Sequence, residues 1–296
     1  MMIDDSRYAA DFESCRLLVE SRLAEFFADN CSYEGLLDSM RYSLLAGGKR
    51  VRAVICMKFC EAAGGDPMRA LDAACAIEML HAYTLIHDDL PCMDDDDLRR
   101  GLPSNHIKYG DATALLAGDA LQAAAFDTLL SSSLPFSGIV DASRILARVA
   151  GPHGICGGQF LDLRGVGKSL SEAELRELYL LKSASLISAA AEIGVVVAGG
   201  SREQIGAAGD FGSAVGFAFQ VRDDLLDYSS SSLALGKPVG SDRDNNKVTF
   251  ASLFSLNECE ELIRLQSDIA VSAISRFFSD VGFLSWLVGF LAGRLS

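Results

Sequence analysis

The chain has 296 residues, enough for one large domain with a sizeable buried core or for two average domains. Half of the residues are hydrophobic and 22% are charged, a globular composition that argues against disorder. The formal net charge of −14 argues against a general nucleic-acid-binding protein, because phosphate backbones require clustered Lys and Arg.

The amino-terminal segment is acidic and lacks the basic and apolar regions of a secretory signal. The longest apolar runs, SLISAAAEIGVVVAGG and FLSWLVGFLAG, are shorter than the roughly 20 residues that cross a bilayer. The eight cysteines form no CxxC pair and have no histidine at zinc spacing. We therefore expect a soluble, cytoplasmic protein without stable membrane insertion. Reduced thiols are favoured over a disulfide or metal framework.

Apolar residues recur at helical spacing along almost the whole chain, and alternating strand patterns are absent. The clearest helical segments are 8–27, 53–63, 70–87 and 260–278. Prolines fall where these patterns break, the serine-rich stretches 129–138 and 228–236 are typical of loops, and Ser169 or Ser171 can cap a helix. The pattern predicts an all-α fold, with residues 1–296 forming a single large domain of ten or more helices.

The stretch LIHDDLPCMDDDDLRRGLPSNH holds six aspartates. A helix entering it carries His81 and Asp88 on one face, seven residues apart. Pro91 interrupts that helix, so Asp94 must return toward Asp88 through a bulge. We interpret 95–97 as the solvated rim of this loop.

A second acidic patch lies in GFAFQVRDDLLDY. On a helix, Gln220, Asp223, Asp224 and Asp227 share an arc of roughly 100°. Such a patch is either a solvated face or a cation site. Two facing sets of carboxylates would suit Mg²⁺, which keeps several waters and is shared with substrate phosphates.

Basic residues recur in short motifs despite the acidic balance of the chain. They are Lys49, Arg50 and Arg52 in GGKRVR, Arg99 and Arg100 in LRRG, and Lys182, Lys237 and Lys247 further on. Together they indicate two kinds of anion site. In one, the anion would be bound through metal ions held by carboxylates, and in the other Arg and Lys would bind it directly.

In this order, GGKRVR, HDDLPCMDDDDLRRG, GGQFLDL, KSA, FQVRDDLLDY and GKPVGSD…NNK resemble the short-chain trans-prenyltransferases, most closely the bacterial farnesyl diphosphate synthases. The resemblance covers roughly residues 35 to 255. It implies a helical bundle of the isoprenoid synthase type around a central cavity, and a homodimer.

The resemblance also implies the metal ligands. Asp88 and Asp94 would bind two Mg²⁺ ions and Asp223 a third when substrate is bound, with Mn²⁺ as an alternative. The carboxylates that would hold metal-bound waters and fix the geometry are Asp89, Asp224 and Asp227.

The resemblance implies isopentenyl diphosphate and an allylic diphosphate as substrates. The allylic diphosphate would be bound by the metals with Arg99, Lys182 and Lys237. The metal-free site for isopentenyl diphosphate would consist of Lys49, Arg52, His81 and Arg100. Catalytic roles fall to Lys182, Gln220 and Arg99. Other residues implied at or near the cavity are Ser183, Phe219, Gln159 and Lys247.

Product length would depend on the residues five and four positions before Asp88, which are Tyr83 and Thr84. A bulky Tyr83 is similar to the cavity floor of members that stop at fifteen carbons, so we expect a farnesyl diphosphate synthase. A geranylgeranyl diphosphate synthase is the first alternative. A terpene cyclase and a non-catalytic regulatory subunit are disfavoured, because both aspartate motifs and the second diphosphate site are present.

Overall fold

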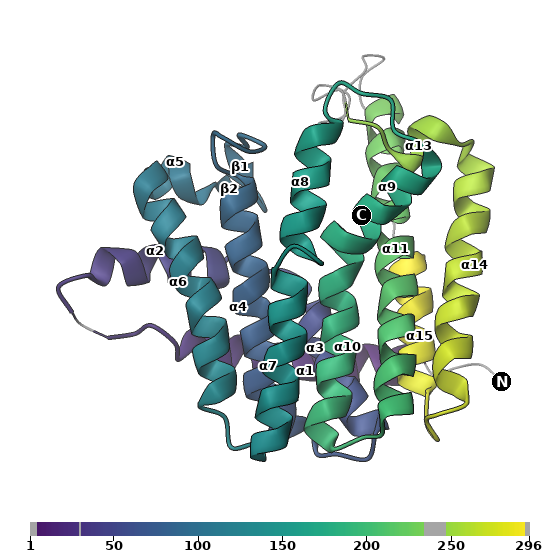
Figure 1. Cartoon of the computed structure of the whole chain (residues 1–296), viewed down its shortest axis with the longest axis horizontal. Helices are drawn as coiled ribbons and strands as arrows, with labels where there is room; N and C mark the ends of the chain where they lie inside the picture. Colours follow the sequence, from purple (N-terminus) through teal and green to yellow (C-terminus); the bar gives the residue numbers. More distant parts are fainter. Residues whose placement is uncertain (1–4, 30, 234–246, 294–296) are drawn as a thin grey trace. The chain divides into compact units, whose positions relative to one another are not determined.

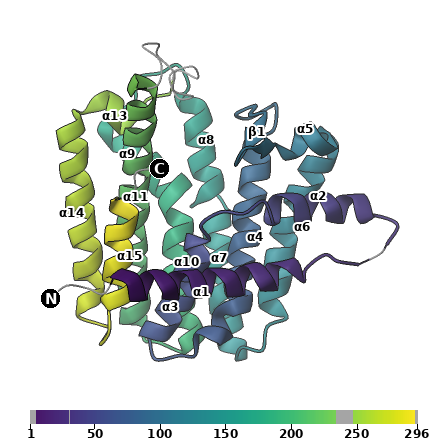
Figure 2. The same cartoon turned by 180° about the vertical axis from the view of Figure 1, so that it is seen from behind.

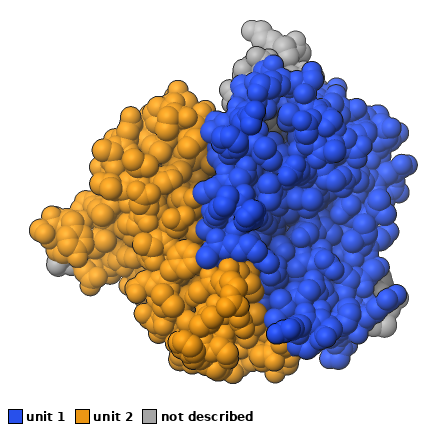
Figure 3. Space-filling view, in the orientation of Figure 1, with its two compact units in different colours: residues 1–3, 147–192, 201–296 blue, residues 4–146, 193–200 orange. Residues whose placement is uncertain are grey.

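The computed structural model of the chain describes residues 5–29, 31–233 and 247–293. Within these ranges it is helical apart from one small hairpin, and it holds more than ten helices (Figure 1). The all-α prediction is therefore confirmed. Residues cluster into two compact units, unit 1 (1–3, 147–192 and 201–296) and unit 2 (4–146 and 193–200), which Figure 3 colours separately. That the chain forms a single domain around a central cavity stays a prediction.

Unit 2 is built around α4, which contacts α3 on one side and α6 on another. Small side chains such as Ala74, Cys75 and Ala76 are fully buried on α4 and allow this close packing. Helix α1 contacts both α3 and α4 and crosses them (Figure 2). The elements that begin here are α1 (Asp5–Ala24), α2 (Glu34–Leu44), α3 (Val51–Ala62), η1 (Pro67–Ala70), α4 (Leu71–Asp88), β1 (Leu98–Arg99), β2 (Leu102–Pro103), α5 (Asn105–Tyr109), α6 (Asp111–Leu130) and α7 (Phe136–Ala150).

The hairpin of β1 and β2 was not predicted. Its strands pair antiparallel, Leu98 with Pro103 and Arg99 with Leu102. Both turn residues have positive φ, 55° at Arg100 and 77° at Gly101, as a type I′ turn requires. Strands of two residues are too short to show an alternating pattern, so periodicity could not predict them.

Unit 1 is organised around the long helix α11, which runs beside α14 (Figure 1). Its aromatic core includes Phe217, Phe250 and Tyr179, all buried. The elements that begin here are α8 (Ile155–Gly165), α9 (Glu172–Tyr179), η2 (Leu180–Ala184), α10 (Ser185–Ala198), α11 (Arg202–Leu233), α13 (Phe250–Leu253), α14 (Leu256–Ser275) and α15 (Gly282–Ala292). The unit boundaries fall inside α7 and α10.

Two local predictions can be compared directly with unit 1. Ser171 is the N-cap of α9 and forms a capping box with Glu174, as one of the two predicted caps. The loop prediction for 228–236 was wrong over 228–233, because α11 continues to Leu233. A serine lowers helix stability only modestly relative to alanine, so a strong preceding helix can extend through several of them.

The apolar helices can be compared with the prediction that no segment crosses a membrane, and the cysteines with the prediction of reduced thiols. One continuous helical run, 172–198, is long and apolar enough for a membrane span, but 72% of its apolar window is buried inside the structure, as in a core helix. The run exceeds the predicted length because the helix continues through η2 without a break. All eight cysteines are free in the structure, and the reduced state of the thiols stays a prediction. The cytoplasmic location stays a prediction.

Candidate active site

The first aspartate motif forms a closed turn at the end of α4. The helix ends at Asp88, and the backbone N–H of Asp94 then donates a hydrogen bond to the carbonyl oxygen of Asp88 at 2.9 Å. Pro91 lies within the intervening turn. The predicted return of Asp94 to Asp88 by a bulge is therefore confirmed, and both aspartates are half-buried.

The neighbouring Asp89 has a different environment. Its side chain is buried and accepts hydrogen bonds from Arg99, with Nε 2.9 Å from Oδ1. The same guanidinium bonds Asp96 at 3.1 Å. Asp89 therefore fixes Arg99 beside the motif. It does so by direct hydrogen bonds, so this role does not require Asp89 to hold a metal-bound water. Asp89, Arg99 and Arg100 line one small pocket of unit 2.

The predicted metal-free anion site is partly assembled within unit 2. Nη1 of Arg52 lies 3.3 Å from Nε2 of His81. Arg100 donates a hydrogen bond to the carbonyl oxygen of Gly47, and its guanidinium carbon would lie 2.9 Å from a Cβ placed on Gly48. The loop that carries Lys49 thus lies against the Arg100 side chain, and a side chain at Gly48 would displace the guanidinium of Arg100.

The electrostatic environment of His81 is cationic. Burial, followed by the charges of Arg52 and Arg100, holds the pKa of His81 well below its usual value. The imidazole is therefore neutral at pH 7. With a guanidinium as donor, its Nε2 acts as the acceptor.

Arg50, which carried no predicted role of its own, anchors this site. It is a non-glycine residue in the left-handed region (φ 49°) and its side chain is buried. Its guanidinium bonds Glu20 at 2.7 Å, Glu78 at 3.2 Å and the carbonyl oxygen of Leu44 at 2.6 Å. Glu78 also accepts the backbone N–H of Ala53 at 3.3 Å. These bonds fix the backbone on both sides of the GGKRVR motif.

The second aspartate motif lies on α11 in unit 1. Asp224 is buried and accepts hydrogen bonds from the hydroxyl of Tyr179 at 2.6 Å and from the backbone N–H of Phe250 at 2.9 Å. It therefore joins α9 and α13 to α11, whereas Asp223 is half-buried and Asp227 exposed. This placement is compatible with the prediction that Asp223 is a metal ligand and that Asp224 and Asp227 fix the geometry.

A turn of π-helix, η2, carries Lys182 and Ser183. Single π turns inside α-helices are frequent at functional sites. The hydroxyl of Ser183 donates to Oε1 of Gln220 at 2.6 Å, so the KSA and FQVRDD motifs are in direct contact. Phe219, the neighbour of Gln220 on α11, is half-buried.

Asp162 on α8, a residue that sequence reasoning missed, gathers two of the predicted lysines. Its Oδ2 accepts Nζ of Lys182 at 2.5 Å and Nζ of Lys247 at 3.2 Å. Burial opposes ionisation of Asp162, but the two ammonium groups outweigh it and lower the pKa of this carboxyl. Asp162 thereby holds the two ammonium groups side by side. The only earlier signal for Asp162 was its place in GGQFLDL.

Neighbouring residues of GGQFLDL pack against η2. A Cβ on Gly158 would lie 2.3 Å from the backbone nitrogen of Lys182, so glycine is needed there for close helix approach. Gln159 is buried, and its side-chain amide has no hydrogen-bond partner among the described residues. Lys237 lies outside the described residues.

The two predicted chain-length residues lie on α4 and are both buried. Thr84 donates a hydrogen bond to the carbonyl oxygen of His81 at 2.8 Å, which leaves its hydroxyl satisfied inside its own helix. The Tyr83 ring packs edge-on against His87, with ring centroids 5.0 Å apart.

The residues of unit 2 fit a Mg²⁺ site. No group of three or more His, Cys, Asp or Glu side chains converges on a metal position in the described part of the chain. Mg²⁺ usually takes only one or two protein carboxylates beside water and phosphate. The closed turn supplies two such residues, Asp88 and Asp94. Asp223 belongs to unit 1, and its approach to these two stays a prediction.

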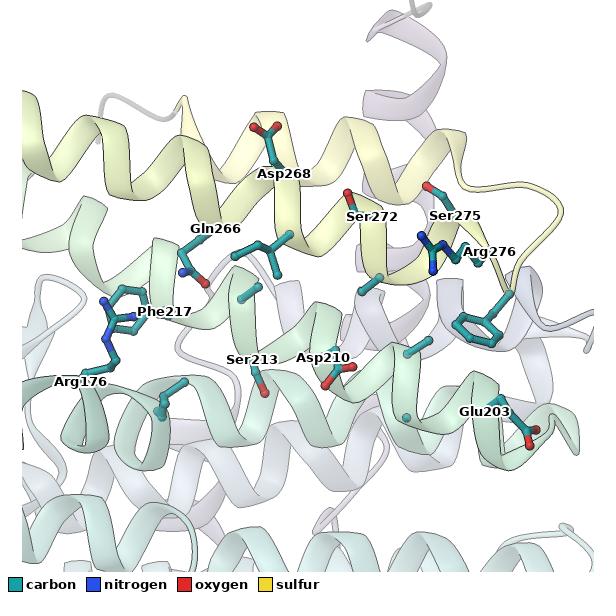
Figure 4. Close-up of a pocket in the computed structure, with 17 residues that line it drawn as sticks. Arg176, Glu203, Asp210, Ser213, Phe217, Gln266, Asp268, Ser272, Ser275 and Arg276 are labelled. Atoms are coloured by element: carbon teal, nitrogen blue, oxygen red, sulfur yellow. The ribbon is translucent and has the colours of Figure 1, made fainter. Parts of the chain in front are cut away.

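A large groove of about 1070 Å³ in unit 1 is separate from these residues. It is lined from α9, α11 and α14 (Figure 4), and none of the predicted site residues lines it. Arg176 stacks over the Phe217 ring at one end, 4.6 Å from its centroid. The groove is not the candidate active site.

Comparison with known proteins identifies the family. The polyprenyl synthetase family model matches residues 34–275. A farnesyl diphosphate synthase from Geobacillus stearothermophilus is 38% identical over 93% of this chain and 94% of its own. The large subunit 1 of a chloroplastic heterodimeric geranylgeranyl pyrophosphate synthase from Arabidopsis thaliana is 42% identical over 87% of this chain and 71% of its own. The crystal structure of a geranyltransferase from Legionella pneumophila superposes with a TM-score of 0.87 at 32% identity, covering 98% of each chain. The chain belongs to the polyprenyl synthetase family, which confirms the predicted trans-prenyltransferase resemblance.

Proposed function

We propose that the protein is a farnesyl diphosphate synthase that joins isopentenyl diphosphate head-to-tail to dimethylallyl and then geranyl diphosphate, releasing diphosphate. The observation that carries this proposal is the cationic site in unit 2, where Arg52 contacts His81 and Arg100 lies against the glycine loop. A site that combines Arg and Lys cations with a neutral imidazole suits a diphosphate that arrives without metal. A terpene cyclase needs no second diphosphate site.

The allylic diphosphate would bind at the aspartate motifs. Asp88, Asp94 and Asp223 would hold Mg²⁺, which would supply positive charge to neutralise the diphosphate. Without such screening, two like charges 4 Å apart repel by about 4 kcal/mol at an effective dielectric of 20. Arg99 would stabilise the leaving diphosphate as its allylic C–O bond breaks. Mn²⁺ is the alternative metal.

Unit 1 would supply the remaining groups of the reaction. Lys182, together with Lys237, would bind the departing diphosphate, and its ammonium group, held in place by Asp162, suits that role. Gln220, held by Ser183, and the ring of Phe219 would shield the allylic cation through a dipole and a π-face. The double bond of isopentenyl diphosphate then attacks the cation, and the departing diphosphate takes up the proton that is lost.

Product length separates this proposal from its main alternative, a geranylgeranyl diphosphate synthase. Relatives carry both names. The buried Tyr83 favours fifteen carbons, because a bulky ring at the cavity floor would stop a longer chain.

We also expect a homodimer. Helix α6 exposes Leu115 and Leu116, and the adjacent α5 exposes Ile107, each with about half of its surface open to solvent. Exposed apolar residues gathered on neighbouring helices are typical of protein interfaces. Light scattering after size-exclusion chromatography measures the oligomeric state directly.

The test of the function is incubation with isopentenyl and dimethylallyl diphosphates and Mg²⁺, followed by chain-length analysis of the products. Farnesyl diphosphate as the main product is expected. Mainly geranylgeranyl diphosphate would favour the alternative. Cyclic products from farnesyl diphosphate alone, or no product with any primer, would refute the proposal.

A further inference from the structure

His87 occupies a space that α6 leaves open at Gly118. A Cβ placed on Gly118 would lie 2.2 Å from Nε2 of His87, far inside van der Waals contact. Gly118 is buried in the middle of α6. Glycine lowers helix stability there by about 1 kcal/mol relative to alanine, and the imidazole of His87 fills the space it provides.

A hydrogen bond fixes the imidazole in this position. Nε2 of His87 lies 3.1 Å from the carbonyl oxygen of Leu115, one turn before Gly118. A carbonyl only accepts, so Nε2 carries the proton and donates it. The carboxylate of Asp119 is 3.9 Å from Nε2 and largely exposed, so it contributes little to the position of the ring.

His87 in turn supports Tyr83, one helical turn earlier on α4. The two ring centroids are 5.0 Å apart and the ring planes meet at 82°, an edge-to-face arrangement. Tyr83 is only 7% exposed. The imidazole therefore forms one wall of the space that holds the tyrosine ring, and α6 holds that wall in place.

We propose that His87, seated on Gly118, is a positioning residue for product length, because it holds the Tyr83 ring in the orientation that stops chain growth at fifteen carbons. The inference rests on the proposed function. His87 does not contact the growing chain in this account. It acts only through Tyr83, so its effect must vanish when the tyrosine ring is removed.

The experiment compares product ratios for wild type, His87→Ala, Tyr83→Ala and the double variant, with isopentenyl and dimethylallyl diphosphates and Mg²⁺. Both products form in the same reaction mixture. If a substitution at His87 disturbs the neighbouring Asp88 and lowers turnover, the ratio of twenty- to fifteen-carbon product is therefore not affected. His87→Ala should raise the ratio by roughly threefold or more, the factor that a lost edge-to-face contact corresponds to. In the Tyr83→Ala background the same change should leave the ratio unaltered.

An unchanged ratio in His87→Ala, or an equal change with and without Tyr83, would overturn the inference. His87→Gln keeps a donor for the Leu115 carbonyl but no ring, so it should also raise the ratio and serves if the alanine variant does not fold. Asp119→Ala is the matched control and should leave the ratio as in wild type. A wild-type protein that makes no prenyl diphosphate would refute the proposed function instead.

Discussion

Nη1 of Arg52 donates a hydrogen bond to Nε2 of His81 across 3.3 Å. A guanidinium has no acceptor, so this contact exists only while Nε2 is unprotonated. Burial and the nearby guanidinium groups hold the pKa of His81 well below its usual value, in agreement with that geometry. The hydrogen bond to the neutral imidazole of His81 therefore orients Arg52 in the site.

This contact predicts how stability depends on pH. Below about pH 6.5 the unfolded chain takes up a proton on His81 that the folded chain does not, so stability falls as the pH falls. The loss that one such group causes is at most about 1.4 kcal/mol per pH unit. Urea unfolding at pH 7.5 and 5.5 should show a smaller loss for His81→Gln than for wild type. Equal losses would contradict a depressed pKa.

The ion pair of Arg50 and Glu78 should be critical for stability. Both side chains are buried, and removing one partner of such a pair typically costs about 3–5 kcal/mol because the other charge is left buried. Glu78→Ala should therefore lower the free energy of unfolding by that order. The salt bridge from Glu20 to Arg50 stays in Glu78→Ala and should hold the loss at the lower end of this range. Asp141→Asn, in the exposed pair of Asp141 and Arg144, is the control and should change it little. Similar effects of the two variants would exclude the anchoring role.

Two glycines of α11 should respond oppositely to alanine. A Cβ on Gly216 would lie 2.4 Å from the Cα of Ala184, at the end of η2, whereas one on Gly206 would meet nothing within 4 Å. Gly216→Ala should destabilise the protein by about 1–3 kcal/mol, and it should reduce turnover by moving Lys182. Gly206→Ala should stabilise it by about 0.5–1 kcal/mol. Thermal unfolding of both variants, compared with wild type, measures the difference.

Asp88→Ala should reduce turnover by orders of magnitude while far-UV circular dichroism and the Tm stay near wild type. The carboxylate is predicted to bind metal, and the backbone bond to Asp94 does not involve it. Asp97→Asn, at the exposed rim of the same run, is the control and should keep its activity. Near-wild-type turnover of Asp88→Ala would remove its predicted metal role.

Tyr83→Ala should lengthen the main product from farnesyl to geranylgeranyl diphosphate, because truncating the ring would deepen the cavity floor. Chromatography of the dephosphorylated products gives the chain lengths. Thr84→Ala removes only a hydroxyl that bonds within α4, and it should change the lengths less. A product distribution unaffected by Tyr83→Ala would refute the steric account.

Features that depend on local chemistry could be predicted from the sequence. Pro91 cannot continue a helix, and this alone predicted that α4 would end and that Asp94 would return to Asp88. The capping box of Ser171 and Glu174 follows from residues three apart. Arg52 and His81 were assigned to one site through their motifs, and the structure brings them into contact.

Features that depend on distant partners could not be predicted. Arg50 stands between Lys49 and Arg52 and has similar chemistry, and only Glu20 and Glu78, 30 and 28 residues away, distinguish its role. Asp162 meets Lys247 across 85 positions. The π turn at Lys182 has no compositional signature, because the same residues are compatible with an ordinary α-helix.

The closed turn between Asp88 and Asp94 fixes the length of the aspartate motif at seven residues. On a regular helix, inserting one residue merely rotates later side chains by about 100°. Here an insertion or deletion would instead break the ring closed by the Asp94 amide and separate the two carboxylates. Grafted intact onto another helix end, the seven residues should carry their geometry with them, whereas a version one residue longer or shorter should not.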